Sequence, residues 1–102
     1  MKLLLITAIK EFEKDIKQIL KKSQVKAFSY KDVKGFKDNS EDAIEANWFA
    51  TNMQENESVL FYAFVLEEKV DTLFELVEVF NKKQVTKSNI HIAVLTIERC
   101  SK

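Results

Sequence analysis

The sequence predicts an α+β fold of the ferredoxin-like class, βαββαβ, in which an antiparallel sheet carries two helices on one face. Two observations support this prediction: apolar runs typical of strands alternate with segments of helical period, and the order strand, helix, strand occurs twice in 102 residues. Because crossover connections are right-handed, the first strand of each half is expected in the centre of the sheet. The length and the 46% hydrophobic content fit a single domain, 1–102.

The first half contains a strand, a helix and a second strand. Residues 2–9 (KLLLITAI) form an apolar run bounded by charge, which we interpret as a buried strand because a clear helical pattern follows it. Residues 10–22 are predicted to be a surface helix, since their apolar positions recur with the helical period at Phe12, Ile16, Ile19 and Leu20. Residues 25–34 (VKAFSYKDVK) contain β-branched and aromatic residues in the alternation typical of a strand.

The second half repeats this order. Residues 58–67 (SVLFYAFVLE) predict a strand, and residues 89–98 (NIHIAVLTIE) predict the last one. Between them, residues 68–83 predict a helix, whose apolar positions keep the helical period at Val70, Leu73, Phe74, Val77 and Phe80.

Both central strands are apolar on both of their faces. A sheet with helices on one face only normally alternates apolar and polar residues, so something is expected to cover the second apolar face. Self-association is the plainest cover, and a bound lipophilic ligand is the alternative. A third interpretation is that central strands are simply more apolar than edge strands.

Composition excludes several classes of function. Sixteen basic and sixteen acidic residues give no net charge, whereas binding to a phosphate backbone requires a basic excess. The opening MKLLLITAI lacks a small-residue cleavage site and is too short to span a bilayer. Cys100 is the only cysteine, so no internal disulfide is possible. We expect a cytoplasmic protein that has no membrane span and does not bind nucleic acid.

The connection predicted at residues 35–57 is long, and loops of this length are usually functional or disordered. Its first half is acidic and is expected to be mobile, whereas Trp48 and Phe49 are typical of interface anchors and ligand pockets. The alternative is that these two aromatic residues fold back onto the domain or its neighbour. Gly35, the only glycine, is expected where the chain leaves the strand, either for close approach of a ligand or subunit or for a turn.

The segment Val33-Lys34-Gly35-Phe36 resembles the VKGFG segment of the nitrogen-regulatory PII family, and the opening MK, the two halves and the closing VLTIE (94–98) fit the same pattern. This resemblance implies a homotrimer whose sheets line the interior, ligands bound in clefts between subunits, and a protein partner engaged through the loop at 35–57. It suggests a regulatory or sensory protein that is not an enzyme. The ligand-binding residues that we predict are Lys34, Gly35, Phe36, Trp48, Phe49, Lys87 and His91.

Two departures from the PII pattern make binding of ATP or ADP doubtful. The phosphate loop of the family is glycine-rich, whereas residues 87–91 read KSNIH, and the arginine-bearing segment that follows the last strand in the family is reduced here to a few residues. The alternatives are a CutA-like divalent-metal-tolerance protein, faintly suggested by Trp48 ten residues before a strand, and a small ferredoxin-like enzyme. The single histidine argues against metal, and no acid/base constellation supports catalysis, so no catalytic or metal-binding residue is predicted. The cofactor, if any, is unknown.

Overall fold

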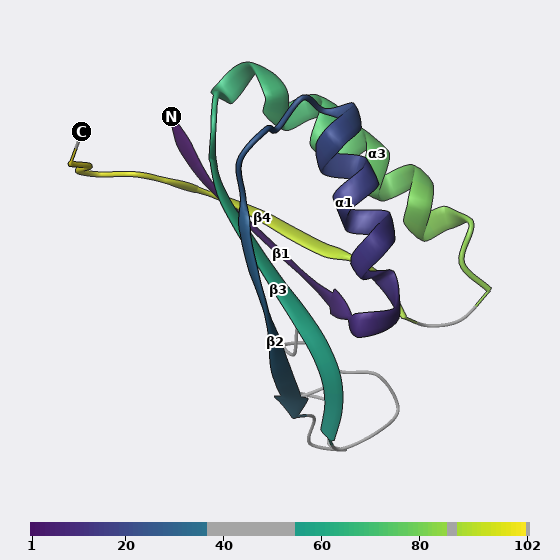
Figure 1. Ribbon diagram of the computed structural model, residues 1–102. Coiled ribbons are helices and arrows are strands. Elements are labelled where there is room, and N and C mark those ends of the chain that lie inside the picture. Colours follow the sequence, from purple (N-terminus) through teal and green to yellow (C-terminus); the bar gives the residue numbers. More distant parts are fainter. Residues whose placement is uncertain (37–54, 86–87, 102) are drawn as a thin grey trace.

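The computed structural model describes residues 1–36, 55–85 and 88–101. These residues form one antiparallel four-stranded sheet in the order β2-β3-β1-β4, and both helices lie on the same side of it (Figure 1). The predicted fold class and the central positions of β1 and β3 are therefore confirmed. The elements are β1 Lys2–Ile9, α1 Glu13–Lys22, β2 Ser29–Phe36, β3 Glu55–Val65, α3 Val70–Lys82 and β4 His91–Thr96.

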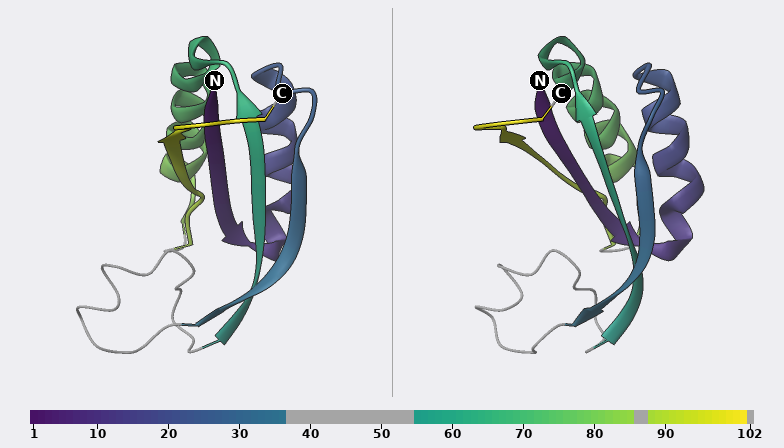
Figure 2. Two further views of the ribbon diagram at one scale, coloured as in Figure 1. Left: turned by 90° about the vertical axis from the view of Figure 1, so that its left-hand side faces the viewer. Right: turned by 60° about the vertical axis from the view of Figure 1, so that its left-hand side comes forward.

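The side views show both helices on one side of the sheet (Figure 2). The core lies between these two layers. Alternate residues of the central strands point toward the helices and are buried: Leu4, Ile6 and Ala8 from β1, and Val59, Phe61, Ala63 and Val65 from β3. The helices bury the apolar stripes that the sequence predicts, with Ile16, Ile19, Leu20, Leu73 and Val77 inside. This packing fixes the direction in which every strand side chain points.

The second strand begins four residues later than predicted, at Ser29 instead of residue 25. The reason is the way in which α1 ends. The Val25 N–H donates to the Leu20 carbonyl at 2.9 Å and the Gln24 N–H donates to the Lys21 carbonyl at 3.0 Å, which is the pattern of a Schellman motif. Val25 is therefore bonded to the helix, and the chain reaches the register of β3 only at Ser29, which pairs with Tyr62.

Gln24 occupies the left-handed position of this motif with φ 61° and is the only non-glycine residue with positive φ in the described ranges. A side chain in that conformation costs about 1–2 kcal/mol, whereas glycine adopts it freely. We expect Gln24→Gly to stabilise the protein by about 0.5–1 kcal/mol, after the greater entropy of glycine in the unfolded chain is subtracted. Urea unfolding monitored by circular dichroism measures this change. Gln18→Gly, at an exposed position in the middle of the same helix, is the control and should destabilise by about 1 kcal/mol.

The connection between β2 and β3 is shorter than predicted, because residues 35, 36 and 55–57 belong to the strands. Gly35 pairs with Asn56 inside the ladder, so the expectation that the chain leaves the strand there is wrong. Its φ is not positive, and the proposed turn at this position is wrong as well. The bounds of β1 are those predicted, and the remaining boundaries shift by a few residues. Short 3-10 turns at Lys10–Phe12 and Glu67–Lys69 lead into the helices.

Candidate functional site

The face of the sheet that points away from the helices is the first candidate site, and we call it the open face. No helix of the described residues covers it (Figure 2). Strand register places Leu3 between Phe64 and Leu95, and it places Leu5 between Tyr62 and Ala93. Among these side chains Phe64 is 53% exposed, Tyr62 43% and Leu95 43%. The second apolar face expected from the sequence therefore exists as a surface of adjacent apolar rows.

Two hydroxyl groups of the open face are buried without a hydrogen-bond partner. Thr7 is 3% exposed and Ser58 is 1% exposed, and neither side-chain oxygen has a partner. The two hydroxyl groups lie close together. Thr7 pairs with Leu60 of β3, and Ser58 is the next residue on the same face of that strand. An unpaired buried hydroxyl is costly by about 1–3 kcal/mol, so this end of the open face is suited to a polar ligand group.

His91 lies directly across from Thr7, on β4. Burial lowers the pKa of its imidazole below the usual value of 6.5, so the ring is neutral at pH 7. The Thr7 hydroxyl makes no hydrogen bond, and therefore the two side chains do not form the bonded nucleophile and base that covalent catalysis requires. The pair can take part in ligand binding through a hydroxyl and a neutral imidazole.

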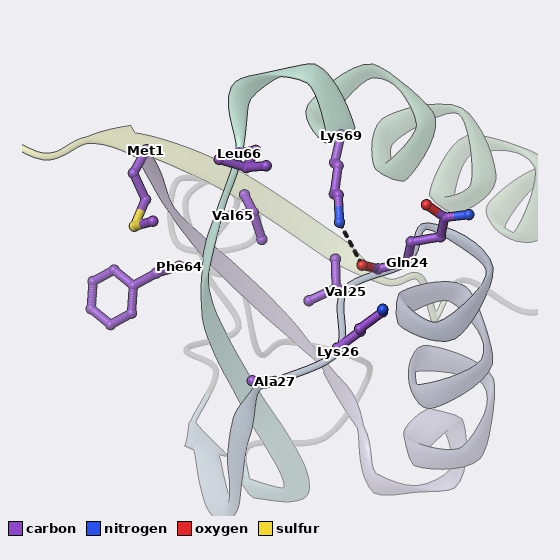
Figure 3. Close-up of a pocket in the computed structure, with 9 residues that line it drawn as sticks. All are labelled: Met1, Gln24, Val25, Lys26, Ala27, Phe64, Val65, Leu66 and Lys69. Carbon is purple, nitrogen blue, oxygen red and sulfur yellow. Dashed lines mark hydrogen bonds between the residues drawn. The ribbon is translucent and has the colours of Figure 1, made fainter.

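A hollow of about 270 Å³ lies at the opposite end of the sheet, beside the end of β3 (Figure 3). Pairing of β2 with β3 stops at Ser29 and Tyr62, so residues 63–65 have a partner strand only on the β1 side. Lys69 crosses the hollow and its ammonium donates to the Gln24 carbonyl at 2.6 Å (Figure 3). The hollow thus combines an open strand edge, two lysines and apolar walls; its lining is Met1, Gln24, Val25, Lys26, Ala27, Phe64, Val65, Leu66 and Lys69.

Three of the predicted ligand residues, Lys34, Gly35 and Phe36, are consecutive in β2. The register places Gly35 on the open face, where it is buried, and places its two neighbours on the opposite side of the strand. Lys34 borders a small hollow of about 200 Å³ that also contains the ion pair between Lys10 and Asp32, at 2.7 Å. The predicted residues Trp48, Phe49 and Lys87 lie outside the described residues.

Gly35 and His91 share the open face but are far apart. His91 is in one row with Thr7, Leu60 and Lys31, and Gly35 lies four residues farther along β2. Strand geometry puts them about 13 Å apart along the strands and about 14 Å apart across three strand spacings. The two residues therefore do not line one pocket within a single subunit.

Sequence reasoning missed Thr7, Ser58 and the open edge at Phe64. A signal for Thr7 was present, since it is the one hydroxyl in the apolar run KLLLITAI and shares the parity of Leu3 and Leu5. Ser58 gives a similar signal on the parity of Tyr62. The open edge had no sequence signal, because it depends on where β2 joins β3.

Neither a metal cluster nor a membrane helix occurs in the part of the chain that the structure describes. Within those ranges, no group of three or more histidine, cysteine or acidic residues is arranged to hold a metal ion. None of the helices there has the length and apolar character needed to cross a membrane.

The sheet order and the two helices on one side define an α+β protein of the ferredoxin-like fold class. Solved structures agree with this class. A nitrogen regulatory PII-like protein, CPII from Thiomonas intermedia K12, is similar with a TM-score of 0.63 and 16% identity over 98% of this chain and 94% of that one. A DUF3240 family protein from Shewanella baltica OS155 is similar with a TM-score of 0.67 and 15% identity over 99% of this chain and 93% of that one.

At these identities the likeness concerns the fold, and the resemblance to PII-like proteins is confirmed at that level. The CPII structure is described as bound to ADP, AMP and bicarbonate. No protein-family model matches this chain. No curated protein matches it either.

Proposed function

We propose that this chain is a PII-like regulatory protein of the cytoplasm, a single domain that assembles as a homotrimer and has no enzymatic activity. The open faces of three subunits pack toward a common interior, a small ligand binds in the clefts between subunits, and a protein partner binds the connection between β2 and β3. The fold and the likeness to a nitrogen regulatory PII-like protein support this proposal.

The observation that carries the proposal is the exposure of the open face. Tyr62 and Phe64 on β3 and Leu95 on β4 are each at least 43% exposed, and Leu3 of β1 lies between Phe64 and Leu95. Soluble monomers rarely leave a contiguous apolar surface of several hundred Å² uncovered. Packing against further copies removes that surface from water and stabilises the assembly by about 25 cal/mol per Å² of apolar area.

The arrangement of polar groups supports ligand binding between subunits. The buried hydroxyls of Thr7 and Ser58 lie at one end of the open face, and the hollow beside Phe64 lies at the other. Neither end encloses a ligand by itself. Association of subunits provides the missing walls, and Gly35 leaves room for close approach because it has no Cβ.

Light scattering coupled to size-exclusion chromatography tests the assembly. We expect a mass three times that of the 11.9 kDa chain at micromolar concentration. A monomeric mass under these conditions would contradict the proposal, because the open face would then be stable in water without a cover. Addition of ligand is not required for this result, since the apolar rows alone drive association.

ATP is expected to bind weakly or not at all. The segment Lys87-Ser88-Asn89-Ile90-His91 has no glycine, so its backbone N–H groups cannot close around a phosphate as a glycine-rich loop does. Titration calorimetry measures this directly. A micromolar or tighter dissociation constant would show that the glycines are unnecessary and that the ligand is a nucleotide.

A further inference from the structure

A groove of about 450 Å³ lies on the helix side of the sheet, between the second half of α1 and the segment that leads to β2. Its lining residues are Lys17, Lys21, Gln24, Val25, Lys26 and Phe28, which include three lysines and no carboxylate. The chain as a whole has no net charge, so this local excess of positive charge is not a reflection of composition. We propose that the groove binds a small organic anion with an aromatic or aliphatic body.

The positive charge of the groove is largely without a counter-ion. Two lysines elsewhere in the described ranges pair with carboxylates, Lys10 with Asp32 and Lys82 with Glu78. Lys21 and Lys26 are exposed, and their ammonium groups make no hydrogen bond or ion pair within the described residues. An anionic ligand supplies a negative counter-charge for these two ammonium groups. Charge-assisted hydrogen bonds of this type are stronger than hydrogen bonds between neutral groups.

Lys17 marks one side of the groove in a fixed position. Its ammonium donates to the Tyr30 hydroxyl at 2.9 Å, lies 3.3 Å from Glu13 and sits 4.3 Å from the centre of the Tyr30 ring. The hydrogen bond to Tyr30 is the largest cause that raises the Lys17 pKa, so this side chain stays charged at any physiological pH. The groove therefore has one positioned cation beside two available ones.

The floor of the groove is apolar and rigid. Val25 is 7% exposed, and the partly buried Phe28 ring packs against Phe61 with centroids 5.6 Å apart. The Schellman motif at the end of α1 and the Lys69 bond to the Gln24 carbonyl hold the chain around this floor. An aromatic or aliphatic body can cover Phe28 while its acid group reaches Lys21 and Lys26. The volume is within the usual range of small-molecule sites.

The lining side chains of the groove come from α1 and from the segment before β2, not from the apolar rows of the open face. Gln24, Val25 and Lys26 also line the hollow beside Phe64, whereas Lys17, Lys21 and Phe28 line the groove and not that hollow. A variant that fails to assemble should bind the anion as well as the native protein does. Anion binding by such a variant tests the groove independently of the proposed assembly.

The test is a titration with 2-naphthoate in low-salt buffer, followed by two-dimensional amide NMR of the full chain. We expect saturable shifts at residues 17–28, and an affinity at least about tenfold higher than for neutral 2-naphthol or for acetate, because the ligand needs both charge and apolar area. The double variant Lys21→Gln/Lys26→Gln should lose about tenfold in affinity. Lys83→Gln, an exposed lysine beyond α3, is the matched control and should bind as the native protein does.

Three results would overturn the proposal. Equal affinity for 2-naphthoate and 2-naphthol would show that the lysines do not contribute. Shifts concentrated on Leu5, Tyr62 and Phe64 would place the probe on the open face. An absence of saturable shifts at residues 17–28 would show that the groove is only a solvated surface.

Discussion

Phe61→Glu is expected to abolish folding. Phe61 is 1% exposed, and its ring stacks on Tyr30 with centroids 4.9 Å apart and contacts Phe28 at 5.6 Å. Glutamate removes these contacts and buries a carboxylate in the apolar core between the sheet and the helices. Such changes destabilise by more than about 4 kcal/mol, which is a large part of the about 5–15 kcal/mol that stabilises a typical domain. Circular dichroism and amide NMR will show a largely unfolded chain.

Phe61→Leu is the control for this prediction, because it keeps an apolar side chain at the same position. It should remain folded and lose about 1–2 kcal/mol in urea unfolding, owing to the smaller volume. A folded Phe61→Glu protein with native stability would mean that the ring does not belong to the core, and the assignment of the two sheet faces would be wrong.

Phe64→Glu is expected to dissociate the assembly while the subunit stays folded. Phe64 is three positions beyond Phe61 and points to the open face, where it is 53% exposed in the isolated chain. Its replacement by glutamate changes the stability of the isolated subunit little, because the position is exposed there. Assembly would bury the glutamate carboxylate among apolar side chains, where it has no cationic partner. Light scattering should return the mass of one 11.9 kDa chain in place of three, with a native circular dichroism spectrum.

Phe74→Glu is the matched control for Phe64→Glu. Phe74 is 40% exposed and lies on α3, on the helix side of the sheet. The same substitution there should leave the mass of the assembly unchanged, since the helices are not expected to face the interior. If both variants assembled normally, the open face would not be the interface. If only Phe74→Glu dissociated, the interface would lie on the helices.

The sequence by itself determined the fold class and the order of the elements. The spacing of apolar residues is a local property of the sequence. In residues 10–22 and 68–83 this spacing is that of a helix with one face packed on a core, and the structure has helices at Glu13–Lys22 and Val70–Lys82. The repeated order and the handedness of crossovers then leave few topologies, so β1 and β3 were correctly expected in the centre. Residues 58–67 are apolar at both odd and even positions, which predicted a second apolar face of the sheet, and the structure shows that face as the open face.

Only the tertiary structure decided where the strands begin and end, and with that the candidate sites. Residues 25–28 have the composition of a strand, but the Val25 N–H is used by the end of α1 and β2 begins only at Ser29. The hollow beside Phe64 and the lysine groove are both lined by residues of this segment outside the sheet. Gly35 is held in the ladder because β3 extends to Glu55 and pairs with it. Pairing between two strands depends on two segments that are distant in the sequence. The residue pattern of one segment alone therefore does not specify where the pairing begins and ends.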